Sequence, residues 1–245
     1  MADFSHLGPG AAAAVVGASG GIGGAFVRLL DGAPGIDRVH AFSRGGAPVG
    51  GTAHPGRLDL EDEASIAAAA AGIEEGALRL VIVASGLLHD GAMMPEKTWR
   101  DVSPDAFARS FAINATGPAL VAKHFLPRMP RRGPAVYAVL SARVGSISDN
   151  AAGGWYAYRA AKAAVNQVIR CLAIEEARRR RELVIVGLQP GTVRTALSAP
   201  FRGAVPAERL MDPDVSAAHL LDVLAGLQPG QSGRLFDWSG AEFPP

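Results

Sequence analysis

Tyr158 and Lys162 stand four positions apart in an alanine-rich stretch that is expected to be helical. Residues at this spacing share one face of a helix, so the phenol and the ammonium would lie close together. A free phenol has a pKa of about 10 and is a poor base at neutral pH, but a nearby positive charge favours the phenolate. The pair could therefore transfer a proton to or from a substrate oxygen. The alternative is a packed tyrosine beside a lysine whose aliphatic stem lies along the helix.

A glycine-rich turn near the N-terminus could bind phosphate. It reads Gly17-Ala18-Ser19-Gly20-Gly21-Ile22-Gly23 and lies between an apolar run and a helical pattern. Glycines in such a turn let backbone N–H groups and the start of the next helix approach a pyrophosphate. Because the chain has 30 glycines, it is the position of the cluster that favours this interpretation over a plain tight turn. We expect the pyrophosphate of a dinucleotide to be bound by Gly17, Ser19, Gly21, Ile22 and Gly23.

The residues after the second expected strand bear on the choice of cofactor. NAD-binding motifs usually carry an acidic residue about 20 positions after the turn, which bonds the ribose 2′-hydroxyl. Here the strand ends in Ser43 and Arg44, whose hydroxyl and planar cation suit a 2′-phosphate. The sequence therefore favours NADP(H), with NAD(H) as the alternative cofactor and a solvated loop as the alternative place for Arg44. Asp59 and Leu60 follow the third strand, where Asp59 could accept a hydrogen bond from the adenine amino group.

Short apolar runs alternate with longer amphipathic ones along the chain. We expect strands at residues 12–17, 38–43, 56–58, 80–84, 135–141, 183–188 and 234–236, and helices at 22–30, 61–71, 104–129, 155–180 and 213–225. Such alternation predicts parallel βαβ units, and continuous apolar strands fit a sheet covered on both faces. No Pro/Ser-rich linker divides the chain. The expected fold class is α/β, with residues 1–245 forming a single Rossmann-like domain: a doubly wound parallel β-sheet with helices on both faces.

Composition argues against several classes of protein. The 245 residues are 49% hydrophobic and 19% charged with a net charge of +1, which excludes disorder and a general affinity for nucleic acid or membranes. The single cysteine, Cys171, excludes a disulfide framework, and no His and carboxylate cluster has metal-ligand spacing, so no metal is expected. The basic run Arg178–Arg181 fits the C-terminal end of a helix better than a nucleic-acid site. No apolar run is long enough to span a membrane and no signal peptide is recognised, so a cytoplasmic protein is expected.

Taken together, these motifs resemble the short-chain dehydrogenase/reductase family over nearly the whole chain. The resemblance is carried by Gly17-x3-Gly21-x-Gly23, Asn114, Tyr158-x3-Lys162 and Pro190-Gly191-Thr192-Val193-x-Thr195. Within the family, the chain is most similar to the branch of C-factor-like cell–cell signalling proteins. That closer match is carried by residues 86–90, 144–150 and 153–159.

The resemblance implies an NADP(H)-dependent oxidoreductase that transfers hydride between the nicotinamide and a small carbonyl or alcohol substrate. Tyr158 would be the general acid/base, Lys162 would lower its pKa and hold the nicotinamide ribose, and Asn114 would anchor a water in a proton relay. Further cofactor contacts would come from Ser85, Gly86, Pro190, Gly191, Thr192, Val193 and Thr195. The resemblance also implies a homodimer or homotetramer built through the two long helices.

Two departures from the family pattern matter. The polar residues that the family has after the fourth strand are absent, and Val83-Ala84-Ser85-Gly86 keeps only the final glycine. At the end of the fifth strand, Ala142 stands where the family has the serine that polarises the substrate carbonyl. Ser141 or Ser146 could replace that serine, and we expect Ser141 because ligands bind at the carboxyl ends of strands in such sheets. Losing one such donor typically costs about 10²–10³ in rate, so the alternative function is a nucleotide-binding signalling or regulatory protein with little turnover.

The substrate side of the site is expected to be formed by two further segments. Trp155 and residues 199–210, which include Pro200, Gly203 and Pro206, could line the pocket, with the second segment acting as a mobile lid. For His89 and Asp90, which lie next to the predicted cleft, a loop hydrogen-bond role is expected, with contact to the substrate as the alternative.

Overall fold

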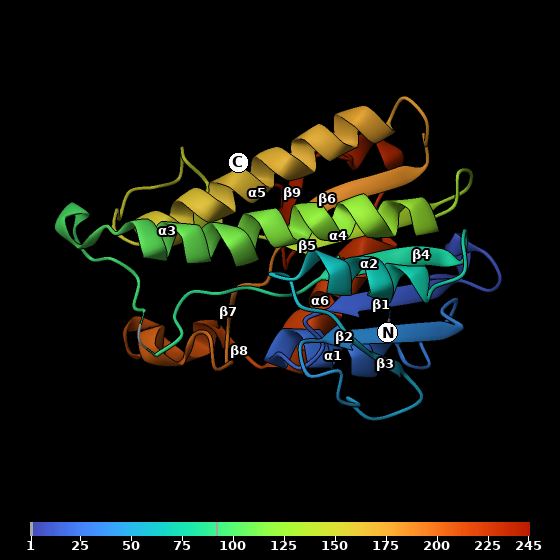
Figure 1. Cartoon of the computed structure of the whole chain (residues 1–245), viewed down its shortest axis with the longest axis horizontal. Helices are drawn as coiled ribbons and strands as arrows, with labels where there is room; N and C mark the ends of the chain where they lie inside the picture. The colour runs from blue at the N-terminus through green and yellow to red at the C-terminus, as the bar shows by residue number, and fades with distance from the viewer. Residues whose placement is uncertain (1, 92) are drawn as a thin grey trace.

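The fold is built on one parallel β-sheet. The computed structural model describes residues 2–91 and 93–245 (Figure 1). Seven strands pair in the order β3-β2-β1-β4-β5-β6-β9, and every pairing is parallel. Their bounds are β1 Ala12–Val16, β2 Arg38–Ser43, β3 His54–Arg57, β4 Leu78–Val83, β5 Ala135–Leu140, β6 Leu183–Gln189 and β9 Leu235–Asp237. A separate two-stranded parallel sheet joins β7 (Thr192–Val193) to β8 (Leu210–Met211).

Helices cover both faces of the large sheet. They are α1 Gly21–Leu30, α2 Glu63–Ala71, α3 Pro104–Phe111, α4 Gly117–Phe125, α5 Tyr156–Glu176 and α6 Pro213–Ala225. Buried apolar side chains of α1 and α6 belong to one hydrophobic cluster, and those of α2, α4 and α5 belong to the other. Figure 1 shows these two groups of helices around the sheet. The apolar residues of β1 alternate between the two clusters because successive side chains of a strand point to opposite faces. The predicted doubly wound parallel sheet with helices on both faces is confirmed.

The predicted helix over residues 104–129 is wrong in one respect, because it is broken. A π-helical segment, Ala112–Thr116, separates α3 from α4, and a 3-10 turn at Leu126–Arg128 ends the run. Pro118, in the first turn of α4, has no backbone N–H and its ring crowds the preceding turn, so it kinks or breaks a regular α-helix there. Asn114 lies inside the π-helical segment, which is the kind of distortion that often occurs at functional sites.

Other boundaries shift by a few residues. The last predicted helix turns of 155–180 are lost because α5 ends at Glu176, and the predicted strand 80–84 begins earlier, at Leu78. The strands β7 and β8 and the 3-10 turns Ala199–Ala204 and Ala207–Arg209 were not predicted. Within the part of the chain that the structure describes, no helix has the length and apolar character that crossing a membrane requires.

Candidate active site

The glycine turn lies where β1 runs into α1, and its shape depends on missing side chains. Gly17 has a φ of +93°, and a Cβ there would come within 2.6 Å of Ser85 Oγ. A Cβ on Gly23 would collide with the Gly17 carbonyl oxygen. The first residues of α1 receive no side-chain cap, since Gly20 occupies the N-cap position. The N-terminal N–H groups of α1 are therefore available to a phosphate.

Thr195 lies beside this turn. A Cβ on Gly21 would come within 2.8 Å of Thr195 Cγ2, so the loop after β6 contacts the start of α1. In that loop Gly191 has a φ of +77°, and a Cβ there would collide with Met211 on β8. The Ser216 hydroxyl of α6 donates to the Pro190 carbonyl at 2.7 Å. The structure thus brings Thr195 next to the glycine turn and fixes the loop through partners that no sequence motif indicated.

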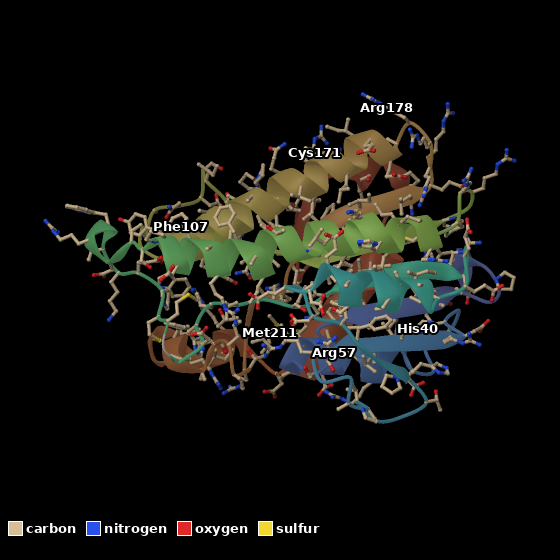
Figure 2. All side chains as sticks on the ribbon, in the orientation of Figure 1. His40, Arg57, Phe107, Cys171, Arg178 and Met211 are labelled. Atoms are coloured by element: carbon tan, nitrogen blue, oxygen red, sulfur yellow. The ribbon has the colours of Figure 1, made fainter. Side chains whose placement is uncertain are left out.

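Two arginines, Arg44 and Arg57, lie near the end of β2. Ser43 is buried and accepts a hydrogen bond from the Gly46 amide at 3.1 Å, whereas Arg44 is exposed. Arg57, labelled in Figure 2, is paired in register with Ser43 on the neighbouring strand β3. Its guanidinium is 3.6 Å from the Asp62 carboxylate at the surface. Sequence reasoning missed Arg57 because its place beside Ser43 depends on the strand register.

Asp59 and Leu60 follow β3 as expected. Asp59 is half-buried, and its Oδ1 accepts a hydrogen bond from the Glu61 amide at 3.1 Å. Leu60 is buried against Gly117, where a Cβ would come within 2.8 Å of the leucine side chain. Leu60 thereby links the third strand to the start of α4.

Tyr158 and Lys162 share a buried face of α5. The Lys162 Nζ lies 5.7 Å from the centre of the Tyr158 ring and donates a 2.8 Å hydrogen bond to the Leu140 carbonyl at the end of β5. Burial lowers the pKa of Lys162 to about 8. Burial also raises the pKa of Tyr158 well above its ordinary value, because it disfavours the charged phenolate. The phenol therefore keeps its proton at neutral pH.

Asn114 lies near Lys162, at the backbone that follows β4. It is fully buried, its Oδ1 accepts from the Leu87 amide at 3.0 Å, and its Nδ2 donates to the Leu87 carbonyl at 2.7 Å. A Cβ on Gly86 would lie 3.4 Å from Asn114 Oδ1 and 3.9 Å from Lys162 Nζ. The glycine after β4 therefore allows Asn114 and Lys162 to approach the same short stretch of backbone.

The two serines near the fifth strand have other partners. The Ser141 hydroxyl donates to Asn166 Oδ1 at 2.6 Å, and both side chains are buried. Ser146 Oγ is buried and lies 3.4 Å from the Pro245 carbonyl oxygen. Ala142, which is partly exposed, offers only a methyl group. The prediction that Ser141 polarises a substrate carbonyl thus requires its hydroxyl to leave Asn166.

An aromatic group covers Tyr158, which is only 8% exposed. The Trp155 ring centre lies 6.3 Å from that of Tyr158 and 5.0 Å from that of Phe201, in the 3-10 turn Ala199–Ala204. The His89 ring lies 5.8 Å from Phe201, and its Nε2 is 3.2 Å from the Leu197 carbonyl oxygen. His89 thus contacts the segment of Leu197 and Phe201 through both its ring and its Nε2.

Asp90 is bonded within the loop that follows β4. Asp90 accepts a hydrogen bond from the Met93 amide at 3.0 Å and lies 3.7 Å from Arg109, which fits the expected loop role. Among the described residues no group of three or more His, Cys, Asp or Glu side chains is placed to hold a metal ion.

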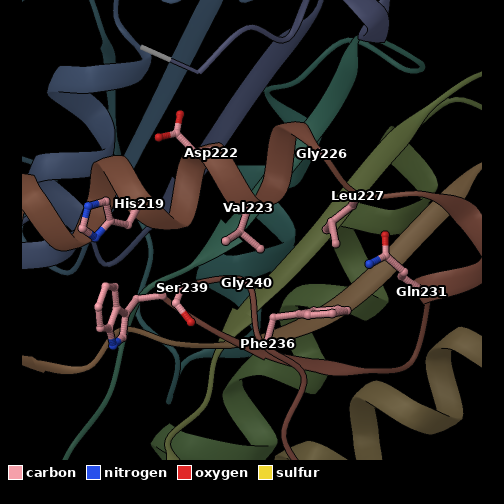
Figure 3. A pocket seen from close by; sticks show the side chains of 10 residues that line it. His219, Asp222, Val223, Gly226, Leu227, Gln231, Phe236, Ser239 and Gly240 are labelled. Carbon is pink, nitrogen blue, oxygen red and sulfur yellow. The ribbon is translucent and has the colours of Figure 1, made fainter.

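A cavity of about 510 Å³ lies elsewhere, between α6 and the segment around β9 (Figure 3). It is lined by His219, Asp222, Val223, Gly226, Leu227, Gln231, Phe236, Trp238, Ser239 and Gly240. None of these residues belongs to the predicted site. The candidate active site is instead at the carboxyl ends of β1, β4, β5 and β6, where ligands bind in open α/β sheets.

Several known proteins are similar to this chain in sequence. The family model described as short chain dehydrogenase matches residues 11–205. The C-signal of Myxococcus xanthus is 39% identical over 144 residues, which make up 59% of this chain and 81% of that protein. The 1-hydroxy-2-glutathionyl-2-methyl-3-butene dehydrogenase of Rhodococcus sp. (strain AD45) is 31% identical over 223 residues, or 90% of this chain and 93% of that protein.

A solved structure shares the fold of this chain. A short-chain dehydrogenase/reductase from Burkholderia multivorans with bound NADP is 27% identical and has a TM-score of 0.75, covering 96% of this chain and 99% of that one. The family match over most of the chain and the shared fold confirm the resemblance read from the motifs. The chain belongs to the short-chain dehydrogenase/reductase family of oxidoreductases.

Proposed function

We propose that the protein reduces a small carbonyl compound with NADPH, or oxidises the corresponding alcohol with NADP, and that Tyr158 is the general acid/base. The observation that carries this proposal is the buried pair of Tyr158 and Lys162 on α5, with Lys162 Nζ bonded to the Leu140 carbonyl at the carboxyl end of β5. A buried phenol that keeps its proton suits protonation of a carbonyl oxygen.

The residues present fit a dinucleotide. The cradle at Gly17 and Gly23 is one that a Cβ would fill, and the start of α1 is free of side-chain caps. We propose that this turn holds the pyrophosphate, that Arg44 and Ser43 hold the 2′-phosphate, and that Lys162 holds the nicotinamide ribose. NADPH, when bound, would supply the hydride that the reaction needs.

In the reduction, Tyr158 would give its hydroxyl proton to the carbonyl oxygen, so that one hydride and one proton convert the carbonyl to an alcohol. The Lys162 ammonium would stabilise the phenolate that this leaves, because opposite charges attract strongly where water is excluded. Asn114, which contacts Gly86 beside Lys162, would support the return of a proton through water.

A second donor to the carbonyl depends on Asn166. Its Nδ2 is buried without a hydrogen-bond partner among the described residues, while its Oδ1 accepts a hydrogen bond from the Ser141 hydroxyl. A rotation of the Asn166 amide by half a turn would let Nδ2 donate to Ser141 Oγ. The Ser141 hydroxyl could then turn its proton toward a substrate, which is how the predicted role of Ser141 would be fulfilled.

The proposal is tested by following NADPH oxidation with a panel of aldehydes and ketones, with NADH measured in parallel. Turnover of one or more carbonyl compounds with NADPH, at a higher kcat/KM than with NADH, is the expected result. Absence of turnover across the panel, with the nucleotide tightly bound, would contradict it.

Two observations favour a second function. Ala142 lacks the hydroxyl that the family uses, and the chain is similar to the C-signal of Myxococcus xanthus. A nucleotide-binding signalling protein with little turnover would bind NADPH and reduce none of the carbonyl compounds at ordinary rates. The same panel therefore separates the two functions.

A further inference from the structure

Glu96 is a buried acid outside the predicted site. It lies in the segment between β4 and α3 and is only 5% exposed. Its Oε2 accepts a hydrogen bond from the Ala157 amide at 3.2 Å, and its backbone carbonyl accepts one from the Trp155 amide at 2.6 Å. Its Oε1 is buried and has no hydrogen-bond partner among the described residues. One residue therefore holds two amides at the start of α5.

The start of α5 needs such support. Trp155, at the N-cap position, has a φ of +53° and is the one non-glycine residue of the described chain in the left-handed region. A bulky residue in this region is strained and persists only where its surroundings hold it. The Trp155 side chain supplies no cap to the helix. A carboxylate at a helix N-terminus both accepts from a free amide and interacts favourably with the helix dipole.

The residues that Glu96 holds lie next to the proposed chemistry. The Trp155 ring contacts the rings of Tyr158 and Phe201, and Ala157 directly precedes Tyr158. The Ala157 carbonyl also accepts a hydrogen bond from Ser110 Oγ at 3.2 Å. Through these contacts, the backbone at the start of α5 determines the positions of the Trp155 ring and of the Tyr158 hydroxyl.

Ser110 continues this network toward the site. Its Oγ accepts a 3.2 Å hydrogen bond from Asn114 Nδ2, and Asn114 approaches Gly86 beside Lys162. A continuous series of hydrogen bonds therefore runs from Glu96 through Ala157 and Ser110 to Asn114. A shift of Glu96 would therefore move both the start of α5 and Asn114.

We propose that Glu96 is a positioning residue for the reaction. Its carboxylate and its backbone carbonyl together fix the start of α5, and so the places of the Tyr158 hydroxyl and the Trp155 ring. This inference rests on the proposed role of Tyr158. Small misplacements of reacting groups cost catalysis heavily, which makes kcat the parameter that should respond.

Three variants test the inference. Glu96→Ala removes the acceptor of the Ala157 amide, whereas Glu96→Gln keeps an acceptor oxygen in the same place. Glu176→Ala is the matched control, because Glu176 lies at the other end of α5 and pairs with Arg180 at 3.1 Å. The measurements are kcat and KM with a carbonyl substrate, the Kd of NADPH, and hydrogen exchange of the amides at residues 155–159.

Glu96→Ala should lower kcat by about 10- to 100-fold and leave the Kd of NADPH within about twofold. It should also speed amide exchange at the start of α5. Glu96→Gln should restore most of kcat and the slow exchange, and Glu176→Ala should leave both close to the wild type. If the alanine variant does not fold, Glu96→Asp takes its place, because a side chain one methylene shorter pulls the start of α5 and should also lower kcat.

Unchanged kcat and exchange in Glu96→Ala would overturn the inference. A loss of kcat in Glu176→Ala as large as in Glu96→Ala would overturn it too, because the effect would then be general to the helix. Failure of Glu96→Gln to restore either readout would do the same. If the wild type turns over no carbonyl compound, the proposed function fails, and amide exchange alone then decides whether Glu96 fixes the start of α5.

Discussion

The Lys162 ammonium lies 5.7 Å from the centre of the Tyr158 ring, and both groups are buried on one face of α5. Burial disfavours the charged form of each, so it lowers the pKa of Lys162 and raises that of Tyr158. Burial therefore keeps the phenol protonated and holds the pKa of the neighbouring lysine at about 8. A bound cofactor that carries positive charge on its oxidised ring would favour the phenolate again.

Stability should depend on pH through Lys162. Its pKa is about 8 in the folded protein, against 10.5 for the ordinary side chain, so between these values the unfolded chain binds more protons. Stability contributed by this group therefore rises with pH across that window, by at most about 1.4 kcal/mol per pH unit. Urea unfolding of the wild type and of Lys162→Met should show the wild type gaining on the variant from about pH 8 upward. A constant difference across that range would contradict the burial of Lys162 in its charged form.

Arg44 should govern the preference for NADPH. If its exposed guanidinium contacts the 2′-phosphate, Arg44→Ala should weaken NADPH binding by about 10- to 100-fold and leave NADH binding nearly unchanged, since charged hydrogen bonds contribute about 1.5–3 kcal/mol. Arg38→Ala is the matched control because Arg38 is exposed at the opposite end of the same strand. Fluorescence titration with both nucleotides gives the two dissociation constants. Equal losses for NADH and NADPH would argue against a 2′-phosphate site.

A hydroxyl at position 142 should accelerate the reaction. Ala142 is partly exposed and follows the end of β5, where the family has its second donor. Ala142→Ser should raise kcat by about tenfold or more, because one added donor to the developing oxyanion is worth up to about 10²–10³. Ser141→Ala, measured alongside, reports the cost of removing the hydroxyl that Asn166 holds. No gain in Ala142→Ser would mean that the protein does not stabilise the oxyanion from this position.

Phe201 should affect substrate binding more than cofactor binding. Its ring contacts the rings of Trp155 and His89, so Phe201→Ala removes apolar surface from the proposed substrate pocket. The KM of the carbonyl substrate should rise by about tenfold, in line with the loss of a partly buried aromatic contact, while the Kd of NADPH stays unchanged. Phe107→Ala is the control, because Phe107 stacks on Phe111 in α3 instead. An equal effect of both substitutions would argue against a specific role of the 3-10 turn at Ala199–Ala204.

The sheet and its helices could be predicted because continuous apolar strands and amphipathic helices leave a periodic signal. The glycine turn and the spacing of Tyr158 and Lys162 could be recognised because backbone and helix geometry impose them locally. The break at Ala112–Thr116 was missed although Pro118 marks it, because the apolar residues continue at helical spacing through it. The two-residue strands β7 and β8 were missed because they are too short to carry any pattern.

Long-range partners account for the rest. The bond from Ser141 to Asn166 joins residues 25 positions apart, and the contact of Glu96 with Ala157 joins residues 61 apart. Neither Asn166 nor Glu96 differs in the sequence from a surface residue on a helix or loop. Their burial follows from packing of α5 on the sheet and on the segment after β4, which no local pattern specifies. The same holds for Arg57, whose place beside Ser43 is set by strand register.

The most direct measurement of the proposed reaction is hydride transfer by Tyr158→Phe, followed as NADPH oxidation in a single turnover with a carbonyl substrate that the wild type reduces. The variant keeps the ring packed under Trp155 and lacks only the proton donor. NADPH should bind with the affinity of the wild type, and the rate of hydride transfer should fall by about 10²–10⁴, the usual contribution of a general acid. A variant that reduces the substrate at the wild-type rate would contradict the role of Tyr158 as the general acid/base.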